Sequence, residues 1–112
     1  YEPVESREFR LKILAEDFRA AGTAVLDSLA EYAKEQPGWS IAPDNCEGVR
    51  VNLDKAHGDG WFLLRLSLHD PILPLNIESD REHGARTIAR QLAPFLAQQV
   101  NIDASSALEF TL

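Results

Sequence analysis

Residues 60–79, GWFLLRLSLHDPILPLNIES, decide the fold that we predict for this chain. Residues 61–67 are predicted to form one strand and residues 72–78 another. In the second strand the apolar residues at alternate positions share one face. The break at residues 68–71 is short and ends in a proline. The segment therefore predicts two consecutive strands of one sheet, joined by a short connection.

Two further strands are predicted upstream of this segment. Residues 49–53 alternate apolar residues with Arg50 and Asn52, and a turn with two glycines at residues 55–60 leads to the next strand. This pattern predicts an antiparallel hairpin. Residues 9–13 alternate in the same way and predict the first strand. Residues 39–48 contain Pro43, Asp44, Asn45 and Gly48, which predicts a loop.

Two helices are predicted, one between the first and second strands in the sequence and one after the last strand. The first runs over residues 17–35, with Asp17 as its N-cap and an apolar stripe close to period 3.6. For the second, Ser79 and Glu82 predict a capping box. Gly84 is expected to weaken this helix, and Pro94 to kink or end it. The alternating Leu108, Phe110 and Leu112 predict either a short edge strand or a tail.

The predicted order is strand, helix, three strands, helix. It corresponds to an α+β fold, in which an antiparallel four-stranded sheet carries two helices packed on one face. The 112 residues form one domain, residues 1–112, and can bury a hydrophobic core without disulfides.

Charge and composition exclude several function classes. The net charge of −7 opposes nucleic-acid binding and binding to anionic membranes, because both need a surplus of Lys and Arg. No apolar run is long enough to span a membrane, and no signal peptide is seen. The single cysteine, Cys46, forms no internal disulfide, which predicts a cytoplasmic protein. The absence of methionine predicts a piece cut from a longer chain.

Within residues 60–79, Arg65 and Ser67 are the candidate residues for binding an anion. They lie two residues apart, so they project from the same face of one strand. The turn that follows them exposes backbone N–H groups, and together these donors can form a cradle for a phosphate or carboxylate. Spacing alone also allows a simpler role, in which Arg65 pairs with a surface carboxylate and Ser67 caps a turn.

The chain resembles the last domain of the α-D-phosphohexomutases, the phosphomannomutase and phosphoglucomutase family. That domain carries G-V-R-V and then G-W-x-L-x-R-x-S-N-T-x-P-x-L-x-L. This chain has GVRV at residues 48–51, GWFLLR at residues 60–65, Ser67, and Pro71. EFRLKI at residues 8–13 and LNIES at residues 75–79 also match the family's order of elements. The resemblance covers residues 6–100.

The resemblance implies a role in an enzyme that interconverts hexose 1-phosphate and hexose 6-phosphate, an isomerase that acts as an intramolecular phosphotransferase. In that family a phosphoserine and Mg²⁺ lie on other domains, and the last domain grips the phosphate of the substrate. By resemblance, Arg65, Ser67 and His69 would bind the phosphate of mannose or glucose phosphate. The partners would be that hexose phosphate and the other domains of the parent chain. This chain would hold no catalytic residue and no metal, and would have no mutase activity of its own.

The chain departs from the family at the tip of the loop. Leu68 and His69 stand where the family has Asn and Thr, and Pro74 interrupts the following strand. A divergent, non-catalytic anion-binding or interaction module of the same fold is therefore a second hypothesis. A third is a small enzyme that uses His69 and Asp70 as acid and base, which requires a deep pocket around them.

Other candidate residues are given structural roles. His57, His69, His83 and Cys46 do not have the spacing of a zinc site, so no metal is predicted. Residues 57–60, HGDG, lack the lysine of a phosphate-binding P-loop and predict a hairpin turn instead. We expect Cys46 to be a packed or incidental thiol.

Overall fold

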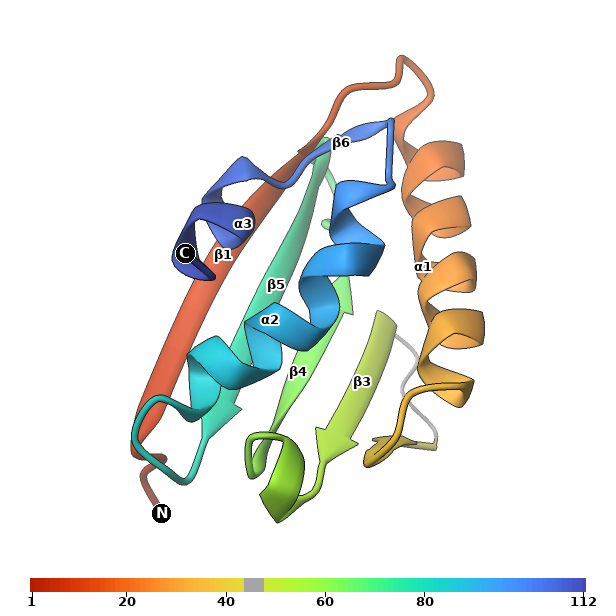
Figure 1. Ribbon diagram of the computed structural model, residues 1–112. Coiled ribbons are helices and arrows are strands. Elements are labelled where there is room, and N and C mark those ends of the chain that lie inside the picture. The colour runs from red at the N-terminus through yellow and green to blue at the C-terminus, as the bar shows by residue number, and fades with distance from the viewer. Residues whose placement is uncertain (44–47) are drawn as a thin grey trace.

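The computed structural model describes residues 1–43 and 48–112, and it has an α+β fold (Figure 1). The predicted loop residues 44–47, which include Cys46, lie outside the described residues. The strands are β1 (Glu5–Ile13), β2 (Trp39–Ile41), β3 (Gly48–Leu53), β4 (Gly60–Arg65), β5 (Ile72–Ser79) and β6 (Ile102–Asp103). The helices are α1 (Phe18–Lys34), the 3₁₀ turn η1 (Lys55–His57), α2 (Gly84–Ala97) and α3 (Ser105–Phe110).

The strands form one antiparallel sheet in the order β2-β3-β4-β5-β1-β6. The predicted hairpin between β3 and β4 is confirmed, and the first predicted strand pairs with β5 along its length. The prediction of four strands was wrong in number, because short strands β2 and β6 extend the two edges. β2 replaces the first residues of a predicted loop. It forms because Trp39 is buried between Tyr32 and Phe62, a contact that local turn residues do not reveal.

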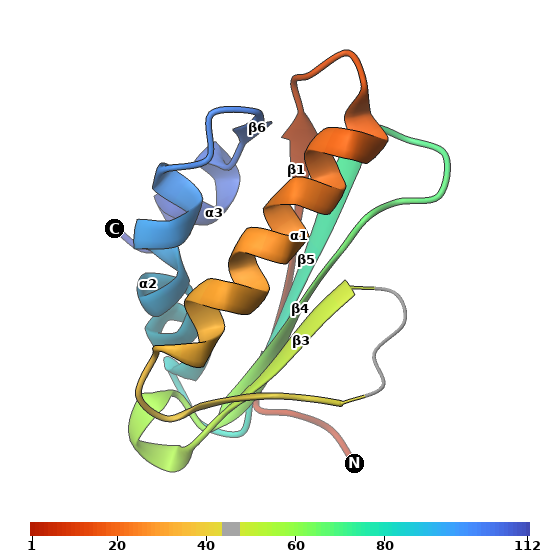
Figure 2. The ribbon, with the colours of Figure 1, turned by 90° about the vertical axis from the view of Figure 1, so that its right-hand side faces the viewer.

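Helices α1 and α2 cover one face of the sheet, as predicted, and no helix of the described residues covers the other face, which we call the open face (Figure 2). Alternate residues of the four long strands point into the core beneath these helices, and Phe62 at its centre is fully buried. Asp17 caps α1 as predicted, because its carboxylate accepts a hydrogen bond from the backbone N–H of Ala20 at 3.2 Å. The apolar side chains that the four long strands bury beneath the helices are Leu11, Ile13, Val49, Val51, Leu53, Phe62, Leu64, Leu73, Leu75 and Ile77.

The predicted capping box at Ser79 is wrong. Ser79 is the buried last residue of β5, and its hydroxyl donates to the carbonyl of Gly58 at 2.6 Å. The helix begins five residues later, at Gly84, after His83 in the left-handed region. Gly84 does not weaken the interior of a helix. Instead it lets the first turn of α2 pack directly on Ser79, where a Cβ would overlap the serine side chain.

A residue that is distant in sequence caps α2. The carboxylate of Glu5 accepts hydrogen bonds from the backbone N–H groups of His83, at 2.9 Å, and Ala85, at 3.0 Å. Partial burial raises the pKa of Glu5, but these two donors, with the charges of Arg7 and His83, outweigh that effect. The pKa of Glu5 therefore lies below its ordinary value, and Glu5 joins the start of β1 to the start of α2.

We expect Glu5→Gln to lower the free energy of unfolding by about 1 kcal/mol at neutral pH, the usual size of a helix cap. Because the pKa of Glu5 is lowered in the folded state, its contribution is fully present above its ordinary pKa. It is lost as the pH falls through the folded pKa. The difference between wild type and variant, measured by urea unfolding, should shrink in acid. A difference that does not change from neutral to strongly acidic pH would contradict this role.

The C-terminal residues form neither the edge strand nor the tail that the sequence predicts. Pro94 does not end α2, which continues to Ala97. Leu108 and Phe110 belong to neither a strand nor a tail, because residues 105–110 form α3. Their side chains are half-buried against the core, and the helix is held to α2 by Arg86, whose Nε donates to the carbonyl of Phe110 at 3.1 Å.

Candidate anion-binding site

The strands β4 and β5 separate at the segment that carries the predicted site. Their pairing ends at Leu64 and Leu75, and the register then sets Arg65 opposite Pro74. Pro74 has no N–H to donate, so the ladder cannot continue through this pair in the ordinary way. One further bond, from the N–H of Ser67 to the carbonyl of Ile72 at 3.0 Å, closes the neck of the connection.

Three contacts anchor the connection between β4 and β5 to the rest of the protein. Leu66 turns inward and packs on the core beside Gly22 of α1, where a Cβ would press against its side chain. The guanidinium of Arg19, in the first turn of α1, donates to the carbonyl of Leu68 at 2.5 Å. The carbonyl of Pro71 accepts from the N–H of Ile13 at 2.8 Å. These contacts hold the loop at the end of the sheet where β1 ends and α1 begins.

The tip of this loop presents backbone donors. Within residues 1–43 and 48–112, the backbone N–H groups of Leu68, His69 and Asp70 form no hydrogen bond to the protein. All three residues are exposed, and the Leu68 side chain is 71% exposed. A run of free N–H groups at a turn is a general binding element for anions. The His69 side chain adds a ring N–H donor.

Arg65 and Ser67 lie where the sequence analysis placed them, and they share the open face of the sheet. Phe62 and Leu64 face the helices and are fully buried, so Arg65 faces the opposite way and is half-buried. By the same alternation Ser67 shares the face of Arg65. The structure therefore brings Arg65, Ser67 and the loop with His69 together at one corner of the sheet.

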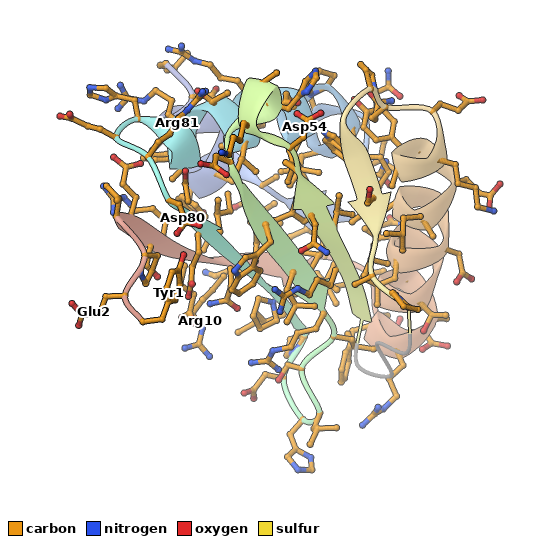
Figure 3. The ribbon with its side chains drawn as sticks, turned by 90° about the horizontal axis from the view of Figure 1, so that it is seen from below. Tyr1, Glu2, Arg10, Asp54, Asp80 and Arg81 are labelled. Carbon is orange, nitrogen blue, oxygen red and sulfur yellow. The ribbon has the colours of Figure 1, made fainter. Side chains whose placement is uncertain are left out.

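Two cations that the sequence analysis did not select lie on the same corner. The register pairs Arg10 of β1 with Pro74 and Lys12 with Ile72, both on the open face. Arg10 is labelled in Figure 3, where it projects from β1 on the side turned away from α2. Its alternation with Phe9 and Leu11 was visible in the sequence. The pairing of β1 with β5, which places Arg10 two strands from Arg65, was not.

In the part of the chain that the structure describes, Arg65, Arg10 and Lys12 form no ion pairs. The pairs found there are Lys34–Glu31, His57–Asp54 and His83–Glu82. Beside the corner, the guanidinium of Arg50 lies over the ring of Trp61, 4.2 Å from its centre. We call Arg65, Ser67, Arg10 and Lys12 the basic corner. It offers three fixed charges and a hydroxyl to an anion.

The other candidate residues do not assemble into a site. Within the described ranges, no group of three or more His, Cys, Asp or Glu residues could hold a metal ion. His57 is fixed by Asp54, at 2.5 Å, and its ring packs on Gly38. A cleft of about 540 Å³ between the end of α1, η1 and α2 is lined by residues such as Tyr32 and Pro94. Its lining does not include the basic corner, His69 or Asp70.

Comparison with known proteins does not identify the chain. Neither a scan against protein-family models nor a search of curated proteins returns a match. No helix among the described residues has the length and apolar character that a membrane span requires. The basic corner and the unbonded amides of residues 68–70 are therefore the features of this chain that point to a function.

Proposed function

We propose that this chain is the phosphate-gripping domain of a phosphohexomutase-like enzyme. It would bind the phosphate group of a mannose or glucose phosphate at the connection between β4 and β5. The parent enzyme would interconvert the 1-phosphate and the 6-phosphate of the hexose, with Mg²⁺ and the phosphoserine supplied by other domains. Arg65 would give a bidentate fork, Ser67 a hydroxyl, and His69 with the loop amides further donors.

The observation that carries this proposal is the position of Arg65 and Ser67. Both lie on the open face at the point where β4 leaves the ladder, directly before three backbone N–H groups that the described protein leaves unbonded. Charged and neutral donors thus converge at one exposed corner of a protein whose net charge is −7. Among the described residues, the pairs of His57 with Asp54 and of His83 with Glu82 offer no comparable convergence.

A non-catalytic anion-binding module is the second candidate, and the loop tip favours it. Leu68 brings an exposed apolar side chain to the place where the resembled family has a donor. The carbonyl of Leu68 is also held by Arg19. A site built from backbone amides and arginines would accept phosphate without selecting the sugar attached to it.

An NMR titration in low-salt buffer tests the proposal. Inorganic phosphate, mannose 1-phosphate and mannose are added separately, and the amide shifts of residues 65–70 are followed. We expect both phosphates to shift these amides and mannose to leave them unchanged, because the charge supplies most of the binding. Tighter binding of mannose 1-phosphate than of inorganic phosphate supports the hexose phosphate domain. Equal binding supports the anion module, and no response to either phosphate contradicts both.

A further inference from the structure

We infer that Arg10 and Lys12 of β1 are phosphate ligands, so that the anion is held between β4 and β1 across the width of β5. This inference rests on the proposed function of the basic corner and adds ligands from a second strand, β1. The resemblance includes residues 8–13 as a strand but assigns no role to Arg10 or Lys12. Their place beside the loop comes from the register of the sheet.

The geometry of an antiparallel sheet allows residues of β4 and β1 to bind the same anion. Neighbouring strands lie about 4.8 Å apart, so Arg65 and Arg10, two strands apart, are separated by roughly 10 Å at their Cα atoms. Pro74 lies between them. An extended arginine side chain reaches most of this distance, and both guanidiniums stand on the same face of the sheet. They can therefore converge on one phosphate above Pro74.

A second row repeats the arrangement. Ser67 is bonded to Ile72, and Ile72 is paired with Lys12 on its other side. The hydroxyl and the ammonium therefore flank Ile72 as the two arginines flank Pro74. Side chains two residues apart on a strand are separated by about 7 Å, so the four groups form the corners of a rectangle. The side chains of Pro74, which is buried, and Ile72 form its apolar floor, and they offer no hydrogen bond that competes for the anion.

Two acidic groups near the corner, Glu8 and Asp103, accept hydrogen bonds, whereas the exposed carboxylate of Asp70 at the loop tip has no hydrogen-bond partner among the described residues. Glu8, one row away on β1, accepts a hydrogen bond from the side-chain amide of Asn76 at 3.3 Å. Asp103, paired with Lys12 in β6, accepts from the backbone N–H of Ser105 at 3.0 Å. The interaction with Ser105, with a smaller effect of Lys12, lowers the pKa of Asp103. Arg10 therefore faces the anion with less competition than Lys12, and we expect it to be the stronger ligand.

The class of ligand follows from the number of charges. Three cations, Arg65, Arg10 and Lys12, exceed what a single carboxylate can neutralise, and they suit the dianionic phosphate of a monoester. Arg10 and Lys12 are exposed whereas Pro74 between the strands is buried, so the rest of the ligand extends away from the sheet. A phosphate monoester with a polar body is the ligand that this arrangement fits.

The test uses the charge variants Arg10→Gln and Lys12→Gln and the double variant, with mannose 1-phosphate as the probe. Dissociation constants are measured from the amide shifts of residues 65–70. We expect a rise of about threefold for each single variant and of about tenfold for the double variant. Arg7→Gln is the matched control, because it removes the same charge from the other face of β1. There Arg7 lies 5.6 Å from the ring centre of Phe110.

The outcomes separate this inference from the proposed function. If wild type binds and the double variant binds as tightly as Arg7→Gln, the inference fails and the proposed function stands. If Arg7→Gln weakens binding as much as Arg10→Gln, the effect is one of net charge, and the inference again fails. If wild type shows no binding, the proposed function itself fails. An amide spectrum of each variant that matches wild type away from the corner establishes that the fold is unchanged.

Discussion

Gly84→Ala should lower the free energy of unfolding by about 1–2 kcal/mol, although alanine is the better helix former. An alanine at this position gains about 1 kcal/mol of helix propensity. Its Cβ, however, would overlap the Ser79 hydroxyl and lie 2.7 Å from the carbonyl of Gly58. Ser79 is 1% exposed and cannot move without breaking its 2.6 Å hydrogen bond to Gly58. Overpacking of this kind usually costs 1–3 kcal/mol, so we expect it to exceed the gain.

Urea unfolding of Gly84→Ala and of Thr23→Ala provides the comparison. Thr23 is an exposed position in α1, where alanine should raise stability by a few tenths of a kcal/mol. Adding Ser79→Gly to Gly84→Ala removes the overlapping side chain, so the two changes should be strongly non-additive. A Gly84→Ala protein that is as stable as wild type would show that α2 does not need this close approach.

Arg65→Gln should weaken phosphate binding by at least about tenfold. It removes the charge and the fork at the point where β4 leaves the sheet, and hydrogen bonds to a charged group contribute about 1.5–3 kcal/mol. Glutamine keeps much of the length and polarity of the side chain, so the strand should remain paired with Gly48. The measurement is the same titration with mannose 1-phosphate, read at the amides of residues 66–70.

Arg90→Gln is the control for Arg65→Gln. Arg90 is an exposed arginine of α2 whose Nε donates to the carbonyl of Thr111 at 2.8 Å, on the helical side of the sheet. It should leave phosphate binding nearly unchanged. Equal affinities of wild type and Arg65→Gln would remove the central residue of the proposed site. The loop amides would then have to be considered as the whole of the anion site.

The local pattern of the sequence determined most of the sheet and one helix. The alternation of residues 49–53 and 72–78 predicts strands that the structure contains, and Asp17 with its apolar stripe predicts α1. These features were predictable because a strand or helix that buries one face must repeat its apolar residues at a fixed period. The spacing of Arg65 and Ser67 predicts that they share one face, whereas their selection as phosphate ligands came from the family resemblance.

Tertiary packing decided the edges of the sheet, the start of α2 and the composition of the corner. Ser79 and Glu82 have the sequence pattern of a capping box. In the structure Ser79 is buried beneath Gly84 and the carboxylate of Glu5 caps the helix instead, so α2 begins at Gly84. The pairing of β1 with β5 likewise brings Arg10 and Lys12 to Arg65 across more than fifty residues of sequence. A local pattern sets which face a side chain occupies, whereas the register between distant strands sets which side chain lies beside it.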